Sequence, residues 1–226
     1  MSPTYIDLSH TLDDDVQIYP GDPTFSCCPA LTIEKDGLNV HSISMGSHIG
    51  THVDAPYHFF ANGAQIDTMP LSTFIGNPVV VDVSNKKAKE MITWDDISSY
   101  SEHIRRKAAQ EHGVFVLLYT GWSKHWHSDL YFDHPFLTRD AAQHLVRLGV
   151  KLIGVDTLSP DETRVDGSTP DFGVHEVVLG AGAVIAENLT NLCAIQIGEW
   201  LVSVVPLKLK GCDGSPVRAF AFKAPI

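Results

Sequence analysis

The sequence predicts an α/β (α+β) fold in which a few helices accompany several strands. Apolar runs at 78–83 and 114–119 are rich in β-branched and other large apolar residues, as buried strands are. Residues 138–149 space their apolar side chains as a helix does, and a further apolar strand is predicted directly after them at 151–156. Because the chain shows no internal repeat or linker, we expect a single domain over 1–226.

The N-terminal part of the chain is predicted to contain three strands. Residues 5–12 alternate between apolar and polar side chains, as a half-buried strand does. A turn-rich loop follows at 13–24, where Pro-Gly and Asp-Pro pairs occur. Residues 30–35 and 38–45 are then expected to form a hairpin with its turn at the Asp-Gly pair 36–37.

Two helices are predicted together with the residues that cap them. Thr93 and Asp96 have the spacing of a capping box, and the helix that they begin is expected to run to about Ile104. The basic residues 105–107 would then lie on its solvated end. Thr138 is expected to cap the second helix.

The last quarter of the chain is predicted to be mainly strands. Residues 183–189 are apolar up to Glu187. An unpaired carboxylate at the end of a buried strand is unfavourable, so Glu187 is expected to face a cation. Two further strands are predicted at 200–207 and 218–222, joined by a turn-containing connection at 208–216.

The segment 41–59 concentrates residues of the types that bind metals. His48, His52, Asp54 and His58 fall within eleven residues. Imidazole nitrogens and carboxylate oxygens are ligands that Zn²⁺ and Mn²⁺ accept. Glycine and proline in the segment disfavour a helix. An extended backbone would place His52 and Asp54 on one face, and a bend at the glycines would bring His48 to the same ion.

Ordinary structural roles are the alternative for each of these histidines taken singly, and their density is what favours a metal site. His125 and His127 could form another cluster, but no carboxylate is spaced to join them, so a surface loop is expected there. The cysteines match no zinc-binding spacing and are expected to be free thiols. They are Cys27, Cys28, Cys193 and Cys212.

The charge balance excludes one class of partner. The 226 residues include 16 Lys and Arg and 27 Asp and Glu, so the net charge is 16 − 27 = −11. A nucleic-acid partner would require a basic face. No apolar run reaches the roughly 18 residues that cross a bilayer, and no signal peptide is recognisable. We expect a cytoplasmic protein that acts on a small molecule and binds neither nucleic acid nor membranes.

The chain resembles the metal-dependent cyclase-like hydrolases, a family that includes bacterial kynurenine formamidases and isatin hydrolases. The segment HIGTHVDAPYHF at 48–59 matches the family pattern H-x-G-T-H-x-D-x-P-x-H at every fixed position. Supporting segments within 6–221 are IDLSHTL, YPGDP, LLYTGW, GVDTLSPD, ENLTNL and PLKLKGCDGSPVRAFA. The resemblance implies a swivelling β/β/α domain with a central barrel-like mixed sheet and a few flanking helices.

The resemblance also implies a set of ligands and a catalytic residue. One ion would be held by His48, His52 and Asp54. In members with two ions, Asp54 also bridges to a second ion on His175 and Glu187. The ions implied are Zn²⁺ or Mn²⁺, one or two in each subunit, and the assembly implied is a homodimer or homotetramer. The implied catalytic histidine is His58. Without the resemblance, His175 could be a buried structural histidine and Glu187 a surface-facing strand end.

The function predicted from these features is hydrolysis of an amide or cyclic amide, such as an arylformamide or an isatin-like compound. A metal ion would activate water, and His58 would serve as general base and then as general acid. Glu187 would hold a second ion or orient the water. Tyr19, Phe59 and Trp122 are expected to line an aromatic pocket for a flat substrate.

Two other functions are compatible with the same residues. A cyclase, lactonase or isomerase could use the same site. A non-catalytic metal-binding protein is disfavoured by His58, because a closed structural zinc site needs no additional base. The segment 19–23 reads YPGDP where kynurenine formamidases usually have WPGDT, and the loop 122–134 is additional, so the substrate is left open.

Overall fold

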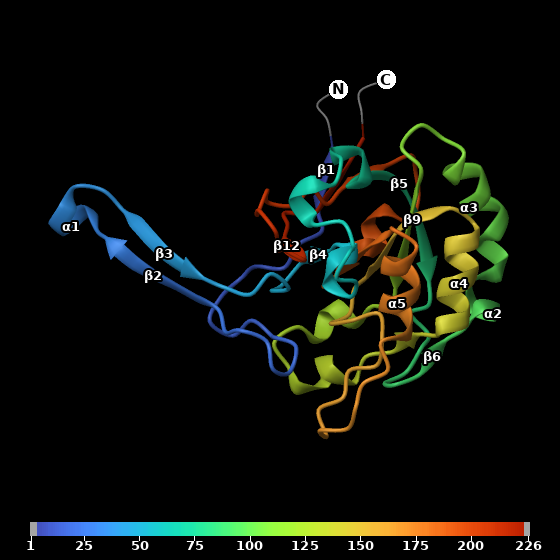
Figure 1. Cartoon of the computed structure of the whole chain (residues 1–226), viewed down its shortest axis with the longest axis horizontal. Coiled ribbons are helices and arrows are strands. Elements are labelled where there is room, and N and C mark those ends of the chain that lie inside the picture. The colour runs from blue at the N-terminus through green and yellow to red at the C-terminus, as the bar shows by residue number, and fades with distance from the viewer. Residues whose placement is uncertain (1–3, 224–226) are drawn as a thin grey trace.

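Nine strands form one mixed sheet whose order brings distant parts of the chain together (Figure 1). The computed structural model describes residues 4–223. The strand order is β1-β13-β11-β5-β7-β9-β10-β4-β12. The bounds are β1 Tyr5–Asp7, β4 His52–Asp54, β5 Ile75–Asp82, β7 Val114–Tyr119, β9 Val150–Val155, β10 Val184–Glu187, β11 Leu201–Ser203, β12 Gly214–Pro216 and β13 Phe220–Phe222.

The four central strands run parallel. β7, β9 and β10 are buried on both faces over most of their length, whereas β5 is only partly buried. β5, β7, β9 and β10 pair with one another in this order. Side chains alternate between the two faces of a strand, so Val116 and Leu118 of β7 join one core while Phe115 and Leu117 join another. The predicted central strand at 114–119 is confirmed.

Helices cover one face of this sheet (Figure 1). Ile104, Leu145 and Val178 contribute one side chain each from three helices to the core that contains Val116 and Leu118. The helices are α2 Trp94–Ile97, α3 Ser101–Ala108, α4 Arg139–Arg147 and α5 Gly173–Gly180. The last of these, which carries His175, is not among the predicted helices.

The sheet curls so that its outer strands approach its central part. Ser9, just after β1, forms a bridge with Leu189, just after β10. Pro206 and Val217 form a second bridge beyond the ends of β11 and β12. The curl encloses a second core, which includes Phe115. This arrangement confirms the barrel-like mixed sheet with a few flanking helices.

The two predicted helices form, with one change of length. Thr93 and Asp96 make the capping box at the start of α2. A short 3-10 segment separates α2 from α3, which ends at Ala108 rather than near Ile104. Within the basic triplet, Lys107 is 4% exposed, so this residue does not lie on a solvated face as predicted. The Thr138 hydroxyl accepts a hydrogen bond from the Ala141 N–H, as expected for the cap of α4.

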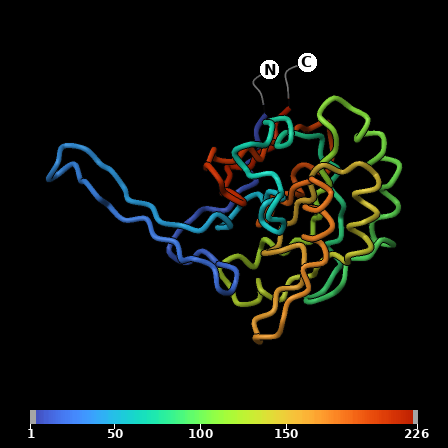
Figure 2. The backbone as a smooth tube through the Cα atoms, viewed as in Figure 1, coloured from blue at the N-terminus to red at the C-terminus, as the bar shows by residue number. Residues whose placement is uncertain are grey.

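The predicted hairpin exists, and its second strand lies within the predicted range 38–45, but its first strand lies elsewhere. β2 spans Ser26–Leu31, α1 spans Ile33–Asp36 and β3 spans Val40–Ser44, so the predicted strand at 30–35 is wrong. The Asp36 carboxylate accepts a hydrogen bond from the Thr32 N–H, and this local bond favours a helical turn. The hairpin projects far from the rest of the molecule (Figures 1 and 2).

The C-terminal connection contains a strand that was not predicted. β12 lies within the expected turn region 208–216 and pairs with β4, where Gly214 is opposite Asp54. A Gly-Ser-Pro sequence has little intrinsic preference for strands, so this pairing depends on the neighbouring strand. The strands predicted at 200–207 and 218–222 are shorter than expected, as is that predicted at 5–12.

Short elements complete the described chain. β6 and β8 form a separate parallel pair. Between residues 4 and 223, no helix is long and apolar enough to cross a bilayer. The bounds of the short elements are β6 Met91–Ile92, β8 Phe136–Leu137, η1 Pro56–His58, η2 Ile66–Thr68, η3 Leu71–Thr73, η4 Ser98–Tyr100, η5 Trp122–His125, η6 Asp129–Asp133 and η7 Leu192–Ile195.

Candidate metal centre

Strand register brings the candidate ligands together at the carboxyl end of the central strands. β4 runs antiparallel to β10, so His52 lies opposite Glu187 and Asp54 lies two residues further along the same strand. His52 and Asp54 therefore share a face, as predicted from their spacing. His48 arrives from the loop before β4, and His175 lies in the first turn of α5. Glu187 Oε2 lies 3.2 Å from His52 Nε2. That Glu187 faces a cation stays a prediction.

The ligand atoms form two groups that share Asp54. In the first, Asp54 Oδ1 lies 2.7 Å from His48 Nδ1 and 3.3 Å from His52 Nε2. In the second, His175 Nε2 lies 3.6 Å from Asp54 Oδ2 and 3.4 Å from Glu187 Oε1. His52 Nε2 also lies 3.2 Å from Glu187 Oε2, which connects the groups. Within each group the ligand atoms lie within 4.8 Å of one another.

Hydrogen bonds outside these groups orient two of the rings. The Gly50 carbonyl can only accept, so His52 Nδ1 donates to it across 2.7 Å. His175 Nδ1 likewise donates to Asp161 Oδ2 across 2.6 Å. Asp161 also accepts from the Val174 and His175 N–H groups at the start of α5. With Nδ1 engaged, Nε2 of each ring is the atom that faces Asp54 and Glu187, and on losing its proton it could bind a metal ion.

Several buried polar atoms in these groups have no hydrogen-bond partner within the described chain. They are His52 Nε2, Asp54 Oδ2 and Glu187 Oε1. An unsatisfied buried polar atom costs about 1–3 kcal/mol, more when it is charged. The three atoms converge from two strands, and divalent cations in the two ligand groups would satisfy them. The residues therefore fit a metal ion of the kind that imidazole and carboxylate ligands bind.

The electrostatics favour positive charge at this position. Burial lowers the pKa of His48, but Asp54 and Asp213 outweigh burial and raise it to about 9. Burial likewise opposes a charge on His52, but Asp54 and Glu187 raise its pKa to about 10. Burial raises the pKa of Asp54, yet the neighbouring histidines hold it well below its ordinary value. The carboxylates that stabilise imidazolium ions would also attract a divalent cation.

His58 lies beside the two ligand groups, in η1. Its Nδ1 is 3.1 Å from Asp213 Oδ2, and the same oxygen is 2.9 Å from His48 Nε2. The rings of His48 and His58 are 4.0 Å apart between centroids. Ser47 Oγ donates to the other Asp213 oxygen. With Nδ1 donating to Asp213, His58 keeps Nε2 free to take a proton.

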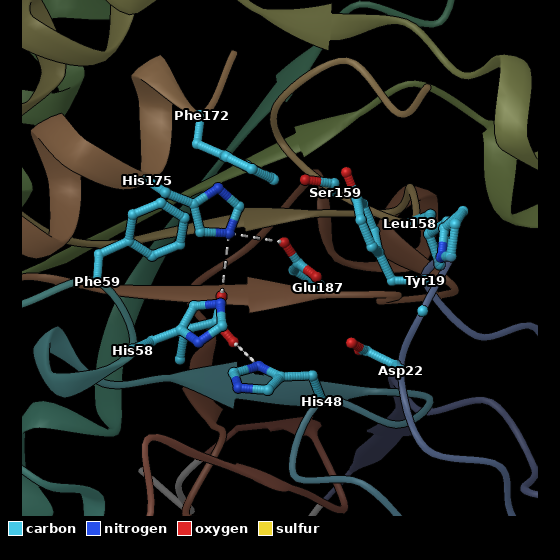
Figure 3. Close-up of a pocket in the computed structure, with 13 residues that line it drawn as sticks. Tyr19, Asp22, His48, His58, Phe59, Leu158, Ser159, Phe172, His175 and Glu187 are labelled. Carbon is cyan, nitrogen blue, oxygen red and sulfur yellow. Dashed lines mark hydrogen bonds and ion pairs between the residues drawn. The ribbon is translucent and has the colours of Figure 1, made fainter. Parts of the chain in front are cut away.

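A cavity of about 440 Å³ opens onto these residues (Figure 3). Phe59 and His58 lie on one side of it, and Tyr19 and Leu158 on the other. Phe172 also lines it, and the ring of Phe59 stacks on His175 with centroids 4.9 Å apart. The size suits a single aromatic ring with its substituents.

Two of the three predicted pocket residues line this cavity. Tyr19 and Phe59 do, and the Tyr19 hydroxyl is buried with no partner in the described chain. Trp122 does not, contrary to expectation. It is 7% exposed and packs with Tyr131 and Leu158, and its Nε1 donates to the Leu130 carbonyl. The indole therefore packs against Leu158, which itself lines the cavity.

The sequence analysis assigned no role to two carboxylates that lie in this centre, Asp161 and Asp213. Asp161 and Asp213 were within segments quoted for the resemblance, but no role was predicted for them. In the sequence, such a role is indicated by the position of each carboxylate in a loop next to the end of a strand. His125 and His127 join none of the metal-ligand groups of residues 4–223, and all four cysteines are free, as expected.

Comparisons with known proteins show the family to which the chain belongs. The family model described as "Putative cyclase" matches residues 6–162. The kynurenine formamidase of Geobacillus thermodenitrificans is 33% identical over 219 residues, 95% of each chain. Isatin hydrolase A of Labrenzia aggregata has a TM-score of 0.82 at 28% identity and covers 99% of this chain and 94% of its own. A predicted metal-dependent hydrolase of Bacillus stearothermophilus has a TM-score of 0.75 at 26% identity, with 99% and 100% covered.

Proposed function

We infer, from the premise that the chain belongs to the cyclase family, that it is a metal-dependent hydrolase. It cleaves a C–N bond, other than a peptide bond, in an amide or cyclic amide. This inference rests on three buried atoms, from His52, Asp54 and Glu187, that have no hydrogen-bond partner within the described chain. They converge beside the cavity that His58 also lines. The names of two relatives, kynurenine formamidase and isatin hydrolase, describe hydrolysis of bonds of this class.

The donor set suits Zn²⁺ or Mn²⁺, with one or two ions in each subunit. His48, His52 and Asp54 would hold one ion, and Asp54, His175 and Glu187 would hold a second. A bound ion of this kind lowers the pKa of the attacking water and polarises the scissile carbonyl. Glu187 would hold the second ion or orient the water.

His58 moves the protons. Its Nδ1 donates to Asp213, so Nε2 can accept a proton from water and return it to the leaving nitrogen. The His58 side chain is 28% exposed and reaches the cavity, which places it beside the substrate.

The cavity favours a planar aromatic substrate. Phe59 and Phe172 meet edge to face, with centroids 5.3 Å apart, and present an apolar wall. The unpaired Tyr19 hydroxyl on the other side can donate to a substrate oxygen. We therefore favour arylformamides and isatin-like cyclic amides over aliphatic amides.

A substrate screen with metal analysis tests this function. Arylformamides, isatin, cyclic imides and lactones are offered to the protein loaded with Zn²⁺ or Mn²⁺. Hydrolysis in H₂¹⁸O should label the product acid, whereas an isomerase would leave its product unlabelled. His58→Ala should retain the metal and lose about 10²- to 10⁴-fold in kcat, the range of general acid–base catalysis. Full activity in that variant would contradict the role of His58.

A further inference from the structure

A third group of potential metal ligands lies beside the cavity, outside the two groups that share Asp54. It consists of His48, His58 and Asp213, whose ligand atoms lie within 4.8 Å of one another. We call it the outer group. Asp213 Oδ2 is 2.9 Å from His48 Nε2 and 3.1 Å from His58 Nδ1. Two imidazoles and a carboxylate are a donor set found in open zinc sites, where water takes a fourth position.

The spacing of the outer group is close to that of a bound ion. Bonds of about 2.1 Å at tetrahedral angles place the ligand atoms about 3.4 Å apart. The two distances to Asp213 fall short of this by a few tenths of an ångström. The Asp213 side chain is 34% exposed and can therefore withdraw. The Ser47 hydroxyl donates to its other oxygen across 2.9 Å and keeps Oδ2 turned toward the two rings.

His48 belongs both to the outer group and to the first group of candidate ligands. Its Nδ1 is 2.7 Å from Asp54 Oδ1, and its Nε2 is 2.9 Å from Asp213 Oδ2. A neutral imidazole keeps one proton, so the ring can bind an ion at each nitrogen only after that proton leaves to solvent. Because this proton must be displaced, the outer group binds an ion more weakly than the first group does. It therefore fills only when metal is in excess.

Solvent reaches the outer group more readily than the buried groups. The side chains of His58 and Asp213 are 28% and 34% exposed, whereas those of His52 and Glu187 are 2% and 8% exposed. An ion can thus enter and leave the outer group without opening of the fold. The Asp22 carboxylate points into the same cavity and adds negative charge that favours a cation there (Figure 3).

An ion in the outer group would disable the proposed base. Without it, His58 Nδ1 donates its proton to Asp213 and leaves Nε2 free. An ion bound to Nδ1 uses the lone pair of that nitrogen, so the one proton of the neutral ring must move through solvent to Nε2. Nε2 can then no longer accept a proton from water. The same imidazole acts either as a base or as a ligand.

We propose that His48, His58 and Asp213 form a third, weaker metal site, and that Zn²⁺ bound there inhibits the enzyme by making a ligand of His58. Zn²⁺ is favoured over Mn²⁺ because imidazole-containing sites bind Zn²⁺ more tightly. The inhibition rests on the proposed function, whereas the binding of the ion does not. Measurements of binding and of activity therefore distinguish the failure of one from the failure of the other.

Equilibrium dialysis of the full chain against rising Zn²⁺ tests the site without any substrate. The wild type should bind one weak ion in addition to its tight ions. Asp213→Asn should keep the tight ions and bind the weak one at least about tenfold less well. Asp166→Asn makes the same change at an exposed carboxylate that accepts hydrogen bonds only from Ser168 in the described chain, and it should bind as the wild type does. Equal binding curves for all three proteins would overturn the proposal.

Nitrogen-15 NMR of the histidine rings tests the role of His58 as a ligand. With only the tight Zn²⁺ ions bound, the His58 ring should carry its proton on Nδ1, and excess Zn²⁺ should move the proton to Nε2. His58→Gln identifies the two signals by their loss. A ring that keeps its proton on Nδ1 at saturating Zn²⁺ would refute the site.

The dependence of activity on Zn²⁺ tests the inhibition. Turnover should fall at least about tenfold as the weak ion binds, because general acid–base catalysis contributes about 10²- to 10⁴-fold. Ser47→Ala keeps every ligand but lets the Asp213 carboxylate turn, so inhibition should require about tenfold more Zn²⁺. Excess Mn²⁺ should inhibit only at higher concentration than Zn²⁺.

Two outcomes would separate the parts of the proposal. An enzyme that binds the weak ion and keeps full turnover would refute the inhibition. Absence of hydrolysis at every metal concentration would contradict the proposed function and the inhibition with it, while dialysis and NMR would still decide whether His48, His58 and Asp213 bind the ion.

Discussion

Asp213 Oδ2 lies 3.1 Å from His58 Nδ1, and this contact joins the loop before β12 to the proposed general base. The carboxylate can only accept, so it fixes the ring with its proton on Nδ1 and leaves Nε2 free. Hydrogen bonds from His48 and His58 hold the pKa of Asp213 well below its ordinary value, so the group is ionised at neutral pH.

Asp213→Asn should therefore reduce kcat/KM about 10- to 100-fold, the range found when a residue that orients a ligand or base is changed. The amide preserves the shape but can present a donor to His58. Steady-state kinetics and metal content measure the effect. The control Asp166→Asn alters an exposed carboxylate that bonds only within its own loop and to no candidate ligand, and it should leave both unchanged. An unaltered rate in Asp213→Asn would mean that the contact does not orient His58.

Asp54 belongs to two groups of candidate metal ligands, one with His48 and His52 and one with His175 and Glu187, whereas Glu187 belongs only to the second of these. Asp54→Asn should consequently remove all tightly bound metal, and Glu187→Gln should remove at most the second ion. Elemental analysis after dialysis gives the stoichiometry. Metal added to the wild type should also raise its unfolding temperature, since an ion that binds only the folded chain stabilises it. Equal metal loss in the two variants would contradict the division into two groups.

Asn188 connects the strand that carries the candidate ligands His52 and Asp54 to the rest of the fold. It has φ 54°, its side-chain amide donates to the Gly50 carbonyl, and its side-chain oxygen accepts from the Tyr131 hydroxyl. The same Gly50 carbonyl also accepts a hydrogen bond from His52 Nδ1. Asn188→Ala should thus destabilise the protein by about 1–3 kcal/mol, because it leaves buried polar groups unpaired.

Asn191→Ala is a matched control for the backbone conformation, since Asn191 has φ 56° and is exposed. Urea unfolding and metal affinity should both be affected more strongly at Asn188 than at Asn191. Asn191 also donates one side-chain hydrogen bond, to the Asp7 carbonyl, but at an exposed site. Similar losses at both positions would mean that the buried hydrogen bonds of Asn188 add little.

The local part of the metal centre was predictable, and the long-range part was not. His52 and Asp54 share a face because of strand alternation, which the sequence displays directly. Asp213 reaches His58 only because β12 pairs with β4, and that Gly-Ser-Pro strand has no strong signal of its own. The hydrogen bonds of Asp161 depend in the same way on the placement of α5. Trp122 was assigned to the pocket from its aromatic character, but its direction is set by packing against Tyr131.

His10 should make the stability depend on acid pH. Its ring stacks on Trp126 with centroids 4.1 Å apart, and burial lowers its pKa to about 4. In the unfolded chain the pKa is near 6.5. As pH falls from about 6.5 to 4, the unfolded chain therefore binds a proton that the folded chain does not, and the folded state loses stability. Protonation of His10 in the folded state ends this loss below about pH 4.

His10→Phe keeps an aromatic ring on Trp126 and removes the titrating group. Urea unfolding at pH 7 and pH 5 should show a smaller loss of stability in this variant than in the wild type. The change in the free energy of unfolding between pH 7 and pH 5, rather than its value at either pH, separates the contribution of His10 from that of other acid-sensitive groups. If both proteins lose the same free energy of unfolding, the His10 ring is already protonated or solvated in the folded chain.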